Sequence, residues 1–116
     1  MTEAQREHCR EIIASARQEA AETAGRLTRR PLREQKAIRA VQCAMAVSLG
    51  EVFGLALTGG EAEEAVRRLE GGNGEHVVSR LLLGWLPAVS ALAVSADTEA
   101  LGWTLAGEFD REDTEG

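Results

Sequence analysis

The chain has 116 residues, of which 44% are apolar and 28% charged, and its formal net charge is −6. This length predicts a single domain over residues 1–116, and the apolar share excludes a disordered chain. Two cysteines exclude a disulfide-stabilised scaffold. Aromatic residues make up only 3% of the chain, whereas alanine is abundant. We therefore expect an all-α fold, a bundle of four to five helices.

Charge is distributed unevenly along the chain. Residues 1–39 carry nine cationic and six acidic side chains, whereas residues 40–116 carry four cationic and thirteen acidic ones. The acidic whole argues against a protein that coats nucleic acid, because long-range attraction to phosphate needs positive charge. The first residues, MTEAQREHCRE, lack the apolar segment of a secretory signal, so we expect a cytoplasmic protein.

Residues 1–27 predict an amphipathic helix. Small or apolar residues recur there at alternating spacings of four and three, which is typical of a narrow packing seam. The seam fits two interpretations: a helix that covers the core of its own chain, or one strand of a two-chain coiled coil. Its members are Cys9, Ile13, Ala16, Ala20, Thr23 and Leu27.

A second helix, expected over about 31–58, starts at Pro31, a residue suited to a first helical turn. One face carries large apolar residues, and another carries Ala46, Gly50 and Gly54 at intervals of four. A helix that is apolar on two sides is buried on both, and small residues let a neighbouring backbone come close. The pattern therefore predicts the central helix of the bundle.

The remaining segments carry helix-boundary signals. Thr58 and Glu61 have the spacing of a capping box, which predicts a short helix to about Glu70. Pro87 predicts a break in the next apolar stretch, and Asp97 is a suitable N-cap for a last helix. We expect Leu101, Leu105 and Phe109 to form the inner face of that helix, and the acidic residues 110–116 to fray.

A run of basic residues is the first candidate contact site. It contains Arg26, Arg29, Arg30, Arg33, Lys36 and Arg39. Five of the six share one face if the helix continues through Pro31, and the basic residues gather around a helix N-terminus if it breaks there. Three interpretations stay open: ion pairs with the acidic second half of the chain, an acidic protein partner, or nucleic acid.

Trp103 is the second candidate contact residue. It points about 200° away from Leu101 around the predicted last helix. One small core cannot easily accept both directions, so Trp103 is either a core residue or the anchor of a protein partner. Tryptophan is strongly enriched among the residues that dominate protein interfaces.

The sequence offers little for catalysis or metal binding. His8, Cys9, Cys43 and His76 lack the short spacings of metal sites, so we expect no metal and no cofactor. Glu51 lies in an apolar stretch, where it fits a solvent-facing edge, half of a buried ion pair, or a catalytic acid. No nucleophile–base arrangement accompanies it, so we expect a protein that is not an enzyme.

These observations favour a small non-enzymatic interaction module that acts as a regulatory, inhibitory or assembly subunit and forms homo-oligomers. We expect Ile13, Ala16, Ala20, Leu27, Ala46, Gly50 and Gly54 to mediate helix packing or self-association. Two alternatives remain. Residues 40–58 and 77–96 could form a two-span membrane hairpin resembling those of phage holins. The basic segment from Arg26 to Arg39 could instead serve a nucleic-acid-linked regulator.

Overall fold

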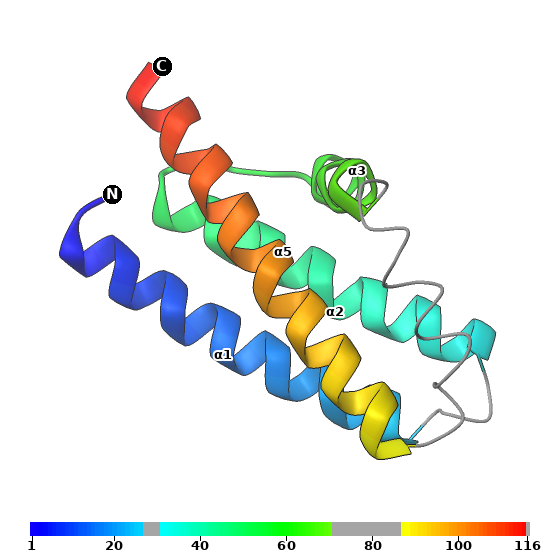
Figure 1. Ribbon diagram of the computed structural model, residues 1–116. Helices are drawn as coiled ribbons and strands as arrows, with labels where there is room; N and C mark the ends of the chain where they lie inside the picture. The colour runs from blue at the N-terminus through cyan, green and yellow to red at the C-terminus, as the bar shows by residue number, and fades with distance from the viewer. Residues whose placement is uncertain (27–30, 71–86, 116) are drawn as a thin grey trace.

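The computed structural model describes the backbone of residues 1–26, 31–70 and 87–115, and the side chains of residues 1–26, 35–69 and 92–113. The described part of the chain is an all-α bundle with four helices and no strand (Figure 1). They are α1 (Glu3–Arg26), α2 (Pro31–Val52), α3 (Gly59–Glu70) and α5 (Pro87–Glu115). The expected fold class is therefore confirmed.

The first and last described helices form the main packing pair. Helix α1 contacts α5 most extensively and α2 next, while α2 also contacts α3 and α5. Helix α3 packs crosswise at one side of the three longer helices (Figure 1). Helix α2 contacts every other described helix, but so does α5. Ala40, Ala44 and Glu51 leave one side of α2 exposed, so the predicted burial of this helix on both sides is wrong.

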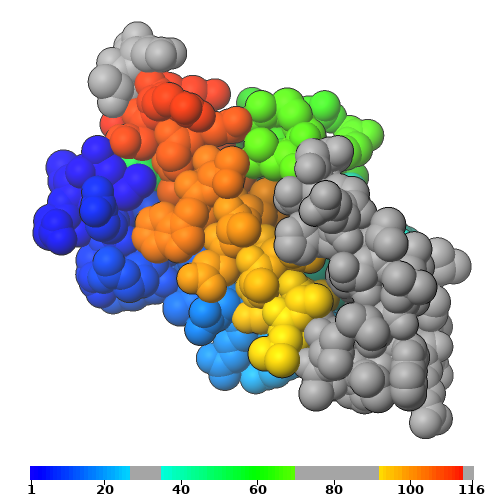
Figure 2. All heavy atoms as spheres, viewed as in Figure 1, coloured from blue at the N-terminus to red at the C-terminus, as the bar shows by residue number. Residues whose placement is uncertain are grey.

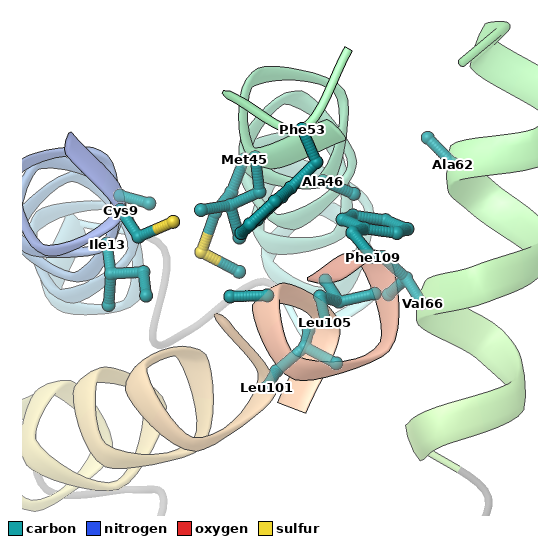
Figure 3. Packing of buried hydrophobic residues seen from close by; sticks show 13 residues of the cluster. Cys9, Ile13, Met45, Ala46, Phe53, Ala62, Val66, Leu101, Leu105 and Phe109 are labelled. Atoms are coloured by element: carbon teal, nitrogen blue, oxygen red, sulfur yellow. The ribbon is translucent and has the colours of Figure 1, made fainter. Parts of the chain in front are cut away.

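The core is built from one face of each helix. Cys9 and Ile13 of α1 meet Met45 of α2 and Leu101 of α5, and Val66 of α3 closes the far side (Figure 3). The buried residues of α1 are those of the predicted seam within the described range, together with Ala24. The seam is therefore covered by the chain's own helices, as the first of the two interpretations requires, while Leu27 lies outside the described residues.

Helix α2 ends earlier than the sequence predicts. The Leu55 amide donates to the Gly50 carbonyl (2.9 Å) and the Gly54 amide donates to the Glu51 carbonyl (3.1 Å). Gly54 has a φ of 77°. This pairing with a left-handed glycine is a Schellman motif, which terminates the helix at Val52. Gly54 is therefore an exposed turn residue, and its predicted place on a helical packing ridge is wrong.

Gly50 is buried, but the neighbour that comes close to it is not another helix. A Cβ at Gly50 would lie 3.0 Å from Leu57 Cδ1 and 3.3 Å from the Leu55 carbonyl oxygen. The chain folds back over Gly50 directly after the Schellman turn. The predicted face of small residues is thus confirmed at Ala46 and Gly50, which are both buried. It does not extend to Gly54, because the helix ends at Val52.

Reciprocal hydrogen bonds begin two of the helices. The Thr58 and Glu61 side chains each accept from the other residue's amide at 3.1 Å, so the predicted capping box is confirmed. Thr2 and Gln5 make the same exchange at 2.9 and 3.1 Å at the start of α1. This second box was not predicted from the sequence.

Helix α5 differs from the expected last helix at both ends. It begins at Pro87 rather than after Asp97, because the intervening alanine-rich sequence continues the helix through Asp97. It also includes residues 110–115, for which the sequence predicts a frayed tail. Its inner face is as predicted, since Leu101, Leu105 and Phe109 are buried.

Candidate interaction surfaces

The basic residues do not share one continuous helix. Helix α1 ends at Arg26 and α2 begins at Pro31, so the break interpretation of this segment holds. Arg26 and Lys36 are exposed, and Arg39 is half-buried. Arg29 and Arg30 lie outside the described residues, as does the side chain of Arg33. The structure thus brings Arg26 and the start of α2 to one end of the bundle.

The outward side of α5 carries an apolar strip. Trp103 is half-buried and packs against the edge of the core, while Leu101 and Leu105 on the opposite side are buried. Leu92 is 73% exposed and lies eleven residues before Trp103, which places both on one side of the helix. Ala96 between them is also exposed. Figure 2 shows α5 from about residue 92 onward forming the surface of the molecule on this side.

A polar border accompanies this outer α5 strip (Leu92, Ala96 and Trp103). Arg17 of α1 donates to the Glu99 carboxylate of α5 at 3.0 Å, and both side chains are about half exposed. Glu99 lies one turn before Trp103. An apolar centre with a charged border is the usual anatomy of a protein interface. Leu92 is the residue that the sequence analysis missed, although its spacing of three turns from Trp103 was a readable signal.

A groove runs between α1 and α2, along the side of α1 that faces away from the outer α5 strip. It consists of two hollows of about 460 and 330 Å³. Their linings share Glu19, Val41 and Ala44, so the two hollows lie next to each other along the helices. The first hollow reaches Arg26 and Ala37, and the second reaches His8, Glu11 and Ser48. The sequence analysis placed no site here.

The remaining polar candidates lie apart from one another. Cys9 is fully buried and reduced, and burial, followed by the nearby charge of Asp110, raises the pKa of its thiol. Glu51 is exposed, which agrees with the solvent-facing interpretation. Within the described residues no three His, Cys, Asp or Glu side chains are placed to hold a metal ion. His76 lies outside the described residues.

One buried polar pair joins α2 to α5. Gln42 Nε2 donates to Thr98 Oγ1 at 3.4 Å, and both residues are buried. The Gln42 Oε1 atom has no hydrogen-bond partner in the described part of the chain. The pair faces the bundle interior rather than either surface, so it bears on packing and not on recognition.

The segment 40–58, considered as a first membrane span, is helical only to Val52. Among the described residues, no helix combines the length and apolar character needed to cross a membrane. Most of the second segment, 77–96, lies outside the described residues.

Comparison with models of known protein families, with curated proteins and with solved structures finds no match for this chain.

Proposed function

We propose that this chain is a non-enzymatic protein-interaction module that acts as a regulatory or assembly subunit of a cytoplasmic complex. The observation that carries the proposal is the outer α5 strip, where Leu92 is 73% exposed and Trp103 half-buried on a helix whose other side fills the core. Large apolar side chains aligned on one exposed helix side are typical of contact surfaces.

The shape of the strip favours a helical partner. Leu92 and Trp103 are separated by three turns, about 16 Å at 1.5 Å per residue. An amphipathic helix laid alongside α5 would bury both anchors with its own apolar face. The Arg17–Glu99 pair at the border offers both charges to the polar flank of such a helix. We therefore infer that the partner presents an amphipathic helix.

The test compares partner binding by variants of the full chain. Proteins retained by the tagged chain in extracts of its native cell are identified, and the partner is purified for direct calorimetric titration. Trp103→Ala is expected to weaken binding at least about tenfold, because tryptophan anchors carry a large share of interface energy. Leu92→Ser is expected to weaken binding severalfold at a stability cost of about 0.5 kcal/mol or less, because the side chain is exposed and only helix propensity is lost.

Thr104→Ala is the matched control, since Thr104 is exposed on a different side of α5. It is expected to bind like the parent. Circular dichroism melting shows whether each variant remains folded. Parental affinity for the partner in both Trp103→Ala and Leu92→Ser would contradict the proposed surface.

The basic residues support the nucleic-acid alternative only through the position of Arg26 and Lys36 at one end of the bundle. Titration of the parent chain with short RNA and DNA duplexes at two salt concentrations separates the two functions. Binding that falls steeply with salt and is lost in Arg26→Gln/Lys36→Gln would favour nucleic acid.

A further inference from the structure

We propose that the α1–α2 groove is a homodimer interface, in which a second copy of the chain lies antiparallel across it. The twofold axis would run across the two helices, so that α1 faces the partner's α1 and α2 faces the partner's α2. The inference rests on the proposed function only in that the chain acts through protein contacts. It uses the opposite side of α1 from the outer α5 strip, so the two surfaces can be tested separately.

The groove is long enough to receive helices. From His8 to Arg26 it follows α1 for about 27 Å at 1.5 Å per residue. Its two hollows, about 460 and 330 Å³, meet at Glu19, Val41 and Ala44. Two adjacent hollows along two neighbouring helices match the elongated contact made by a second helical pair.

The floor of the groove is apolar and short-sided. Ala40 and Ala44 of α2 are exposed, and Ile12 of α1 and Val41 of α2 are half-buried. Because the side chains of Ala40 and Ala44 are short, a facing helix can approach α2 to the 8–10 Å between axes that well-packed helices reach. Burial of this floor supplies the apolar part of the interface.

The two ends of the groove carry opposite charge. Arg26 lines the end that contains Ala37, and Lys36 lies one turn before Ala40 on the same helix. Glu11 lines the end that contains Ser48, and exposed Glu51 follows Ser48 by three residues. The first end also includes exposed Glu22, to which Gln18 donates at 3.4 Å. The three described charged side chains there, Arg26, Lys36 and Glu22, leave an excess of one positive charge.

A single twofold axis satisfies both helices at once. On α1 the point midway between Glu11 and Arg26 falls beside Glu19, and on α2 the point midway between Lys36 and Glu51 falls beside Ala44. Glu19 and Ala44 line the groove at the same level, where the two hollows meet. An axis at this level therefore brings each basic end opposite an acidic end, while at the centre Glu19 faces the partner's Glu19, which is unfavourable and leaves the pairs at the two ends to hold the dimer. A parallel arrangement would instead place like charges together, which is unfavourable.

The decisive experiment uses two complementary charge variants of the full chain. Arg26→Glu/Lys36→Glu makes both ends of the groove acidic, and Glu11→Lys/Glu51→Lys makes both ends basic. We expect the parent to sediment as a dimer at about 100 μM and its dimer to weaken with added salt. Each variant alone should dimerise at least about tenfold more weakly, because its like-charged ends then face each other. An equimolar mixture of the two should restore the dimer as a heterodimer.

Three further variants keep the outcome interpretable. Ala44→Arg places a long charged side chain at the centre of the groove and is expected to abolish dimerisation without disturbing the core. Glu63→Lys changes an exposed charge on α3, and Trp103→Ala removes the anchor of the outer α5 strip. Glu63→Lys and Trp103→Ala are both expected to dimerise like the parent. Trp103→Ala therefore separates a failure of this inference from a failure of the proposed function.

A monomeric parent at about 100 μM would overturn the inference. So would parental dimerisation by the folded charge variants or by Ala44→Arg, since the groove would then lie outside the contact. Folded, monomeric charge variants that do not associate when mixed would overturn the antiparallel arrangement.

Discussion

Ile13 of α1 and Gly102 of α5 lie so close that a Cβ on Gly102 would be 2.7 Å from Ile13 Cγ1 and 3.1 Å from Met45 Sδ. No side chain fits at Gly102 without movement of its neighbours. Among the described glycines, the one that lies closest to another helix is therefore Gly102 of α5, and not Gly50 or Gly54, which the sequence singles out. Ile13 is 3% exposed and β-branched, so it has little freedom to move aside.

Gly102→Ala is expected to lower the free energy of unfolding by up to about 2 kcal/mol. The overpacking cost of about 1–3 kcal/mol is offset by the gain of about 1 kcal/mol that alanine brings to a helix. Urea denaturation measures the change. In an Ile13→Ala background, which removes the clashing atoms, the same substitution should cost much less. An equal cost in both backgrounds would show that the two residues do not interact.

Gly107→Ala, five residues further along the same helix, is expected to have the opposite effect. A Cβ there would meet no atom within 4 Å. The substitution should raise the free energy of unfolding by about 0.5–1 kcal/mol, because glycine in a helix interior carries an entropic cost that alanine removes. A destabilised Gly107→Ala variant in thermal melts would mean that this side of α5 is more crowded than the structure shows.

Gly50→Leu and Gly54→Leu are both expected to destabilise the fold, for different reasons. At Gly50 the added side chain would collide with Leu57 and the Leu55 carbonyl, at a cost of about 1–3 kcal/mol. At Gly54 space is open, and the cost of about 1–2 kcal/mol arises from the φ of 77°. Gly54→Asn should therefore recover much of the loss in thermal melts, whereas Gly50→Asn should not. Equal recovery at both positions would contradict this distinction.

Ionisation of Cys9 should destabilise the protein at alkaline pH. An unfolded chain ionises a cysteine near its ordinary pKa of about 8.5, while in the fold burial first, and Asp110 second, raise the pKa of Cys9. The stability that comes from keeping the thiol neutral is complete below the ordinary pKa and is lost as pH rises above it. Urea denaturation at pH 7 and pH 10 should show a larger loss for the parent than for Cys9→Ala. Equal losses would remove Cys9 as the cause.

Gln42→Met is expected to stabilise the protein by on the order of 1 kcal/mol. The buried Oε1 atom of Gln42 has no hydrogen-bond partner among the described residues, and an unsatisfied buried polar atom costs about 1–3 kcal/mol. Methionine has a similar length and no such atom. Thermal melting at neutral pH measures the change. A loss of stability would show that the hydrogen bond to Thr98 outweighs the unsatisfied oxygen.

Local patterns predicted much of this fold. The spacing from Cys9 to Thr23, the Thr58–Glu61 capping box and the inner face at Leu101 all depend on residues within a few turns of each other, and all are confirmed. The end of α2 was not readable, because the apolar pattern continues past Val52 while the chain turns at Gly54.

The errors in α5 and at the surfaces have a different physical origin. Asp97 is a good N-cap by type, but the residues on both sides of it favour a helix, which continues through it. Gly102 is recognisable as a close helix contact only when Ile13 lies against it in the fold. The groove likewise exists only when α1 and α2 are packed together. Features that need two distant segments in contact carry no signal in either segment alone.

The close fit of α1 against α5 also affects the order of events during synthesis. The residues that α1 buries find their main cover on the last helix, so this helix leaves the ribosome tens of residues before its partner exists. At about 5–20 residues per second the delay lasts several seconds. During that time the narrow seam of α1, whose residues are mostly small, exposes few large side chains, which limits the apolar surface that a nascent chain presents to chaperones and to other chains.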